Sequence, residues 1–261
     1  MRNNLKKLKL KFYNSYLLVS AYLDSIFLKT SQKRLMRFHV RRSDELLILG
    51  TGPSLKSLNV DVLKHVDSLS VNGYARLVAE KKWPETDLYM VQDLEVFRRL
   101  KGDIENLKTS KVFLSHLIRI LFKNNMNFSR KPSIFRHHLL NHAYVESYEN
   151  LNVRVSAIPQ CIVYDGYTVI FSAIQMAVAL GYSRVYLLGV DANYSNNVNQ
   201  RNIIDIGKRD HTFASAGERI SFGIRALVAA YPDLSIYNSS SVSALTFLEY
   251  SNTVSGHEIS S

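Results

Sequence analysis

A short glycine-containing turn is the first feature of this sequence that suggests chemistry. Gly50-Thr51-Gly52-Pro53-Ser54-Leu55 follows an apolar run and precedes a segment that we expect to be helical. Glycines in such a turn let backbone N–H groups approach a phosphate, and a helix N-terminus adds favourable partial charge. Pro53 suits the start of a helix, where its missing N–H is not needed. The turn predicts a phosphate-binding loop, and a plain tight turn is the alternative.

The residues around this turn narrow the kind of ligand. Leu55 stands where GxGxxG has its third glycine, and no GK[ST] follows, so the turn is not a Walker A loop. An NAD-binding unit has an acidic residue about 20 positions on, at the end of the second strand. Asn72 occupies that place. Its amide can donate and accept hydrogen bonds to a base or sugar, which favours a nucleotide other than NAD.

A second polar cluster follows a later apolar run. Gly189-Val190-Asp191 is followed by Asn193 and Tyr194. A carboxylate at the carboxyl end of a parallel strand lies where ligands bind. A tyrosine hydroxyl beside it can donate to a leaving phosphate. We therefore expect Asp191, Asn193 and Tyr194 near a ligand, with capping of the next turn as the alternative for Asp191.

His211 is the best-placed general base among the eight histidines. It lies in the polar stretch Lys208-Arg209-Asp210-His211-Thr212, after the strand that ends near Asp191. An imidazole titrates near neutral pH and can take a proton from an attacking hydroxyl. His138 and His142 have the spacing of metal ligands, but no acidic partner accompanies them, so we expect a solvated basic face there and no metal site.

A parallel sheet is needed to bring these residues together. The pattern predicts helices over 168–180, ending at Gly181, and over 214–231. The predicted strands are 46–49, 68–71, 87–91, 112–115, 184–188 and 234–237. This alternation implies an α/β fold with a Rossmann-like, mostly parallel sheet flanked by helices. We expect residues 116–150, rich in Lys, Arg, His and Asn, to form a small helical insertion or lid that contacts an acceptor.

Positive charge is concentrated at the N-terminus. Residues 1–42 hold eleven Lys and Arg and one acid, so they carry +10 of the total +11 and leave +1 for the other 219 residues. A nucleic-acid enzyme spreads basic charge over its groove, so we expect no nucleic-acid partner. We divide the chain into a basic N-terminal helical appendage, 1–42, and one Rossmann-like domain, 43–261.

The same appendage suggests where the protein acts. Its apolar stretch, 16–28, is too short and polar for a spanning helix of about 20 apolar residues. We expect a basic amphipathic segment resting on anionic lipid. Packing on the core or on a second copy in a homo-oligomer is the alternative. The single Cys161 fits a reducing compartment, so the expected location is cytoplasmic, peripheral on the inner face of the cytoplasmic membrane.

Several parts of the sequence resemble one family. They are the Gly50–Leu55 loop, Asn72, and the run Ala179-Leu180-Gly181-Tyr182-Ser183-Arg184-Val185-Tyr186-Leu187-Leu188-Gly189-Val190-Asp191, with Ser239, Ser240 and Ser243 further on. These residues resemble the bacterial sialyltransferases of glycosyltransferase family 42. They also resemble the related domain first named for an archaeal 6-hydroxymethylpterin diphosphokinase, which recurs in bacterial surface-glycan proteins. The resemblance covers roughly residues 45–250.

The resemblance implies an inverting transfer from a CMP-activated acidic sugar, without metal or other cofactor. In the implied site His211 is the general base, and Tyr194, or Asn193 beside it, supports the leaving phosphate. The implied substrate contacts also include Gly50, Thr51, Gly52, Pro53, Ser54, Asn72, Thr168, Asp191, and either Gln92 or Asp93. Thr51 replaces the usual Asn, and Asp165-Gly166-Tyr167-Thr168 replaces the usual Thr-Ser-Gly. The donor therefore stays open between sialic acid, Kdo and related sugars.

The expected function is a glycosyltransferase of bacterial lipopolysaccharide or capsule synthesis, acting on a glycan or lipid-linked glycan acceptor. One alternative is a pterin-type pyrophosphokinase that uses ATP and Mg²⁺, with Asp93 and Asp191 as metal ligands. Another is a non-catalytic glycan-assembly protein.

Overall fold

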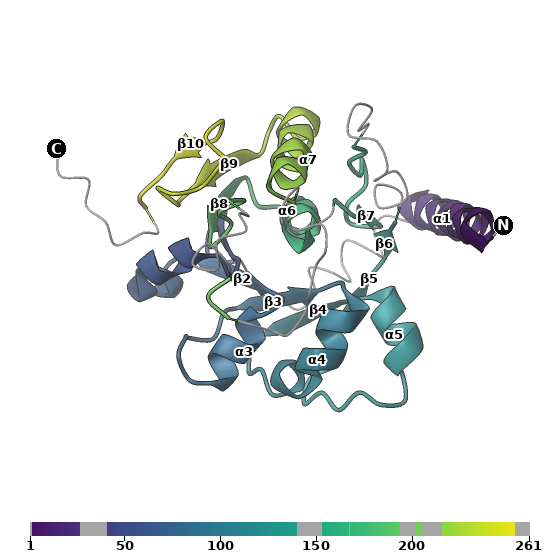
Figure 1. The fold of residues 1–261 in the computed structure, drawn as a ribbon, viewed down its shortest axis with the longest axis horizontal. Coiled ribbons are helices and arrows are strands. Elements are labelled where there is room, and N and C mark those ends of the chain that lie inside the picture. Colours follow the sequence, from purple (N-terminus) through teal and green to yellow (C-terminus); the bar gives the residue numbers. More distant parts are fainter. Residues whose placement is uncertain are drawn as a thin grey trace.

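An eight-stranded parallel sheet is the centre of the computed structural model of this protein (Figure 1). The structure describes residues 2–26, 41–139, 153–166, 168–193, 202–204 and 216–253. The strands of this sheet are β1 (Glu45–Leu49), β2 (Asp67–Val71), β3 (Leu88–Val91), β4 (Lys111–Ser115), β5 (Ser133–Phe135), β8 (Arg184–Leu188), β9 (Ser235–Asn238) and β10 (Glu249–Tyr250). A separate two-stranded sheet pairs β6 (His137–His138) with β7 (Val163–Tyr164).

The strand order contains one reversal. Across the sheet it runs β10-β9-β8-β1-β2-β3-β4-β5, so the chain first builds outward from β1 to β5 and later returns to the other side of β1. At the end of β1, Leu49 pairs with Ser70 of β2 on one side and Leu188 of β8 on the other. In doubly wound sheets, ligands bind in the crevice beyond the carboxyl ends at such a reversal. We therefore expect a binding site beyond the carboxyl ends of β1 and β8.

Helices cover both faces of the sheet (Figure 1). One face carries α3 (Tyr74–Ala79), α4 (Leu94–Glu105) and α5 (His116–Phe122), and the other carries α6 (Val169–Leu180) and α7 (Ala216–Ala230). Two short 3₁₀ helices, η1 (Pro53–Ser57) and η2 (Val60–Lys64), follow β1.

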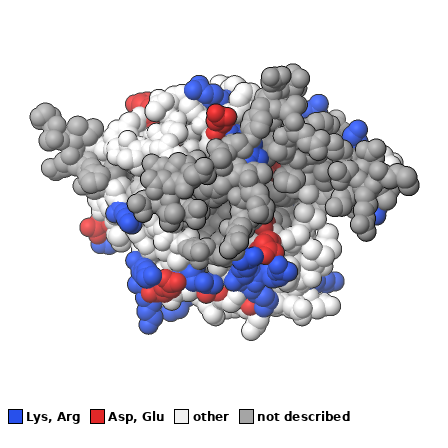
Figure 2. Space-filling model, in the orientation of Figure 1, with Lys and Arg blue, Asp and Glu red and all other residues white. Residues whose placement is uncertain are grey.

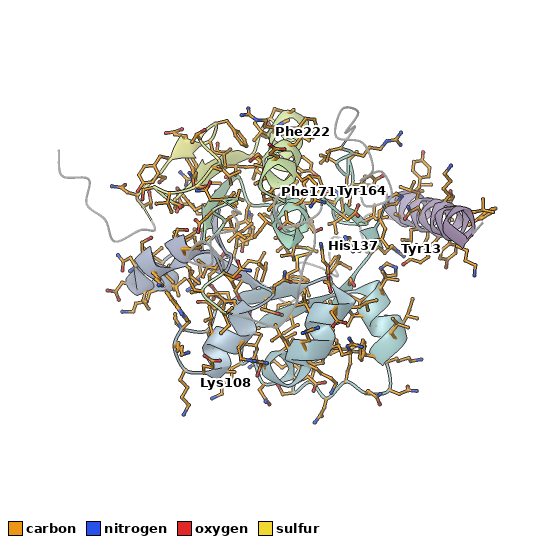
Figure 3. All side chains as sticks on the ribbon, in the orientation of Figure 1. Tyr13, Lys108, His137, Tyr164, Phe171 and Phe222 are labelled. Carbon is orange, nitrogen blue, oxygen red and sulfur yellow. The ribbon has the colours of Figure 1, made fainter. Side chains whose placement is uncertain are left out.

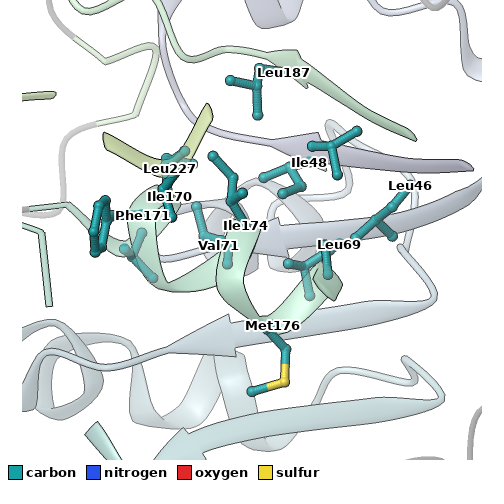
Figure 4. Packing of buried hydrophobic residues seen from close by; sticks show 14 of the residues in the cluster. Leu46, Ile48, Leu69, Val71, Ile170, Phe171, Ile174, Met176, Leu187 and Leu227 are labelled. Atoms are coloured by element: carbon teal, nitrogen blue, oxygen red, sulfur yellow. The ribbon is translucent and has the colours of Figure 1, made fainter. Parts of the chain in front are cut away.

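Both faces of the central strand are buried by these two layers. Leu46 and Ile48 pack with α6 and α7, as Figure 4 shows, and Leu47 and Leu49 pack with η1 and α3 on the other face. Burial on both sides explains why β1 is an uninterrupted apolar run.

The predicted fold class is confirmed. Each of the six predicted strands is present within one residue of its predicted limits, and α6 ends at Gly181, whose φ of +84° makes it a left-handed C-cap. Two expectations differ from the structure. The segment after Gly52 is the five-residue 3₁₀ helix η1, and the described part of 116–150 is helical only at its start, because β5 and β6 follow α5. Residues 140–150 lie outside the described residues.

The N-terminal segment forms one long helix, α1 (Arg2–Ile26), at the side of the molecule (Figure 1). Its buried residues Leu17 and Ala21 pack against Cys161 and Ile162. The side-chain oxygen of Asn14 accepts a hydrogen bond from the Leu139 backbone at 3.1 Å. In the described part of the chain, no helix is long and apolar enough to cross a membrane. One face of the appendage therefore packs on the core, as the alternative expectation had it.

The predicted boundary after residue 42 cuts through a polar network. The Arg42 guanidinium pairs with the buried Asp67 carboxylate at 2.9 Å and also with Asp87. Tyr182 donates to the same Asp67 carboxylate at 2.9 Å. Arg42 therefore contacts the α/β domain directly, and the domain boundary stays a prediction.

Candidate active site

The turns after β1 and β8 are fastened to each other. Gly50 N donates to Leu188 O at 2.8 Å, Gly52 N donates to Gly189 O at 2.8 Å, and Gly189 N donates to Ser54 Oγ at 2.9 Å. A Cβ on Gly50 would lie 2.2 Å from Gly189 O, and Gly189 itself has a φ of +71°. Glycine is therefore required at both positions for the turns to approach this closely.

Asp191 joins a third loop to these two turns. Its buried carboxylate accepts from Ser54 N at 3.0 Å and from Ser240 Oγ at 2.8 Å, and its backbone O accepts from Ala244 N at 2.8 Å. A Cβ on Gly52 would lie 2.4 Å from the same carboxylate. Asp191 thus holds together the loops that follow β1, β8 and β9.

These contacts change the physical explanation of the glycine turn. The backbone N–H groups of Gly50, Gly52 and Ser54 already donate within the protein, and Thr51 O accepts from Ile203 N at 2.8 Å. The glycines are accounted for by the close packing of two turns. The Ser54 hydroxyl accepts from Gly189 and retains its own proton for donation. Phosphate contacts from this turn stay a prediction.

Buried polar atoms without a protein partner mark the same edge of the sheet. Within the described part of the chain, four such atoms belong to residues that come directly after a strand. They are Asn72 Oδ1 after β2, Gln92 Oε1 after β3, His116 Nε2 after β4 and Ser239 Oγ after β9. Buried polar groups almost always have a hydrogen-bond partner. A polar ligand beyond the carboxyl ends of the strands would supply these partners.

Asn72 is held in place by its own backbone. Its φ is +47°, a left-handed conformation that asparagine tolerates better than most residues. The Tyr89 hydroxyl donates to Asn72 O at 2.7 Å, and Asn72 N donates to Met90 O at 3.4 Å. These contacts fix the residue over the ends of β2 and β3 and leave its side-chain oxygen unpaired within the described residues.

The choice between Gln92 and Asp93 now has a structural basis. Asp93 is the N-cap of α4, since its Oδ1 accepts from Glu95 N at 2.8 Å and from Val96 N at 3.0 Å. Gln92 Oε1 is buried and has no hydrogen-bond partner among the described residues. Gln92 is therefore the better candidate for a ligand contact.

Two other predicted contacts have local structural roles. Thr168 is the N-cap of α6, and its side chain accepts from Ile170 N at 3.3 Å. The Asn193 side chain donates to the Val242 backbone, which places it near the loop after β9. The roles of both residues as substrate contacts stay predictions. Tyr194 and His211, the predicted catalytic residues, lie outside the described residues, so their roles also stay predictions.

His116 is a candidate that the sequence argument missed. Its Nδ1 accepts from His137 N at 3.2 Å, so the ring proton of the neutral imidazole is on the buried Nε2. Burial lowers its pKa to about 4, which keeps the ring neutral at physiological pH. The ring stacks on Tyr13 of α1 with centroids 5.5 Å apart. Figure 3 labels Tyr13 and His137, which lie where α1 meets the edge of the sheet.

The residues that the sequence analysis missed could have been identified by their position directly after a strand. His116 directly follows the predicted strand 112–115, and Ser239 directly follows β9. Asn72 was predicted from the same kind of position, whereas a contact from Gln92 or Asp93 was implied by the resemblance.

Charged side chains of both signs lie together on α4. On the face shown in Figure 2, Lys and Arg lie among Asp and Glu. On α4, Glu95 pairs with Arg98 and Arg99, and Lys101 pairs with Glu105 at 2.8 Å. Local ion pairs therefore compensate much of the basic charge on this helix.

Comparison with known proteins gives similarity in structure but not in sequence. No family model matches the chain, and no curated protein matches it in sequence. The structure is similar to that of the monofunctional alpha-2,3-sialyltransferase Cst-I from Campylobacter jejuni, with a TM-score of 0.53, 16% identity and 85% of each chain covered. It is also similar to the sialyltransferase CstII from Campylobacter jejuni in complex with cytidine-5'-monophosphate, with a TM-score of 0.50 and 16% identity over 85% of this chain and 89% of that one. The chain thus has the fold of these sialyltransferases, and the predicted resemblance is confirmed at the level of the fold.

Proposed function

We propose that this protein is a glycosyltransferase that moves a sialic acid-like or Kdo-like sugar from a CMP-activated donor to a glycan acceptor. The observation that carries the proposal is the set of buried, unpartnered polar atoms on Asn72, Gln92 and His116, at consecutive strand ends beside the β1–β8 reversal. The fold, shared with a sialyltransferase described in complex with CMP, supports the choice of nucleotide.

The atoms offered by these residues suit such a donor. Asn72 Oδ1 and Gln92 Oε1 are acceptors, and a cytosine amino group or a ribose hydroxyl is a donor. His116 Nε2 is a neutral donor, which suits a sugar carboxylate or hydroxyl oxygen. We assign Asn72 and Gln92 to the nucleotide or donor sugar and His116 to the sugar.

The proposed reaction is a single inverting displacement without a metal. The acceptor oxygen forms a bond to the anomeric carbon while the bond from that carbon to the CMP phosphate oxygen breaks, and CMP leaves with the electron pair. The acceptor proton goes to His211. Hydrogen-bond donors near Asp191, including Tyr194 or Asn193, stabilise the charge that develops on the phosphate.

The proposal includes a place of action. The protein works in the cytoplasm at the inner face of the membrane, on a glycan or lipid-linked glycan of bacterial lipopolysaccharide or capsule. A homo-oligomer is compatible with this arrangement.

Nucleotide-dependent thermal stabilisation tests the proposal directly. At a CMP concentration 100-fold above its Kd, binding adds about 2.7 kcal/mol to the unfolding free energy. For a chain of this size that raises Tm by about 5 °C or more. UDP, GDP and ATP at the same concentration should give smaller shifts, with and without EDTA. A larger shift with ATP and Mg²⁺ than with CMP would support the pyrophosphokinase instead, and no shift with any nucleotide would support the non-catalytic protein.

His211→Ala separates binding from chemistry. A general base contributes about 10²–10⁴-fold to a rate. We expect turnover to fall at least about 100-fold while CMP still raises Tm. Unchanged turnover would remove His211 from the mechanism.

A further inference from the structure

Apolar side chains lie on both sides of α1, but only one side is buried. Asn14, Leu17 and Ala21 are buried against the core. The opposite side exposes eight large apolar side chains, each with 37–70% of its surface accessible. These residues, which we call the outer face, are Leu8, Phe12, Tyr16, Leu18, Val19, Tyr22, Leu23 and Ile26. Soluble monomers rarely expose contiguous apolar surface of this kind without a partner.

The shape of the outer face is that of an interfacial helix. At about 100° per residue, it covers an arc of roughly 160° on the side opposite Leu17. That arc is wider than the narrow seam of a two-stranded coiled coil. The exposed Lys9 and Lys11 lie at its two margins, where long basic side chains reach lipid headgroups. Tyr16 and Tyr22 are of a residue type that favours the membrane–water boundary, and Phe12 is typical of the apolar face of interfacial helices.

The positive charge of α1 favours an anionic lipid surface as the binding partner of the outer face. The first half of α1 contains five basic residues and no acid, and Asp24 is the one acid of the whole helix. Those basic residues are Arg2, Lys6, Lys7, Lys9 and Lys11. Anionic headgroups attract such a segment. A second copy of α1 would instead bring five more positive charges to the same interface.

We infer that the outer face of α1 is a docking surface for an anionic lipid bilayer, with the helix lying in the headgroup plane and its inner face fixed to the α/β domain. Tyr13, stacked on His116, places this helix beside the carboxyl ends of the strands. Docking therefore brings that edge of the sheet to the lipid surface. The inference deepens the membrane location in the proposed function, but it does not depend on the sugar donor.

Vesicle co-sedimentation of the full chain tests the inference. The probes are phosphatidylcholine vesicles with and without phosphatidylglycerol. We expect binding to the mixed vesicles to be more than tenfold stronger than to the neutral ones. Lys9→Gln with Lys11→Gln should remove most of that difference. Tyr16→Ser with Val19→Ser and Leu23→Ser should abolish binding to both.

The matched control lies on another helix. Phe222 and Val228 of α7 are 45% and 42% exposed, and Phe222→Ser with Val228→Ser should leave vesicle binding unchanged. Equal binding of the unaltered protein to neutral and mixed vesicles would overturn the inference. So would undiminished binding of the triple serine variant.

Light scattering in lipid-free solution tests whether the outer face instead binds a second copy of this chain. A dimer that the triple serine variant converts to monomer would assign the outer face to a second copy and overturn the inference. The CMP-induced rise in Tm should survive in the triple variant, which also shows that it folds. Its absence from every variant and from the unaltered protein would count against the sugar donor and not against docking.

Discussion

Two glutamines, one partly buried and one fully buried, provide a matched test of the candidate site. Gln92 Oε1 is buried and has no partner among the described residues. Gln175 is also buried, but its Oε1 accepts from Ser156 N at 3.2 Å and Tyr164 N at 3.0 Å, and its Nε2 donates to Tyr164 O at 2.9 Å. If Gln92 is unsatisfied because it awaits a ligand, the same substitution at the two positions should have opposite effects on stability.

Leucine has nearly the volume of glutamine and no polar atom. An unsatisfied buried acceptor costs about 1–3 kcal/mol, so Gln92→Leu should raise the unfolding free energy of the nucleotide-free protein by about 1 kcal/mol. That corresponds to a Tm about 2–4 °C higher. The same change leaves a ligand donor unpaired, and a loss of about 1.4 kcal/mol would weaken CMP binding about tenfold.

Gln175→Leu should have the reverse signature. It leaves the backbone N–H groups of Ser156 and Tyr164 without a hydrogen-bond acceptor. It should therefore lower the unfolding free energy by at least about 2 kcal/mol. CMP affinity of the folded protein should be unchanged. Urea unfolding followed by circular dichroism and titration calorimetry with CMP measure the two quantities. The reasoning is refuted if Gln92→Leu destabilises the protein as Gln175→Leu does and leaves CMP affinity intact.

Three further predictions concern the residues that shape the site. Gly52→Ala should destabilise the protein by about 1–3 kcal/mol, because its Cβ would lie 2.4 Å from the Asp191 carboxylate. The control is Gly102→Ala in α4, where the added Cβ would have no atom within 4 Å. This variant should be more stable by about 0.5–1 kcal/mol in the same urea experiment. Asp191→Ala should lower Tm with and without CMP, since it releases Ser54 and Ser240 together; an unchanged Tm would contradict the role of this carboxylate. Burial sets the folded-state pKa of His116 to about 4, below its ordinary value of about 6.5. The unfolded chain therefore binds a proton first, and stability should fall as pH drops from about 6.5 to about 4. His116→Asn should make that fall shallower in urea titrations at pH 7 and pH 5, and an equal fall in both proteins would rule out His116 as its source.

The sheet was predictable because its pattern is local. The central strands are short segments buried on both faces, which gives an apolar run in β1 and β3, and Gly181 ends α6 at the expected residue. The edge strand β5 was not predicted. It has three residues, Ser133–Phe135, and it is defined by pairing with β4 more than by its own sequence.

The site was predictable only where a residue stands directly after a strand. Asn72 could be placed that way, and the resemblance left Gln92 and Asp93 as alternatives at the end of β3. The role of His116 depends on His137 and on Tyr13, which lies over a hundred residues away, and no local pattern contains that information. The Asp191 contacts likewise need the loops after β1 and β9 to arrive at the same point.

The Asp191 carboxylate, which joins three loops, makes one side of the candidate site more rigid than the other. On the side of β1, β8 and β9, the backbone is cross-linked by hydrogen bonds to Asp191 and cannot rearrange one loop at a time. On the side of β2, β3 and β4, single side chains project from strand ends and can be exchanged without disturbing that framework. Loops that are already held in place lower the entropic cost of ordering the protein when a ligand binds. Under the proposed function, substitutions that change sugar preference should therefore be found on the β2–β4 side, while the loops after β1, β8 and β9 keep their shape.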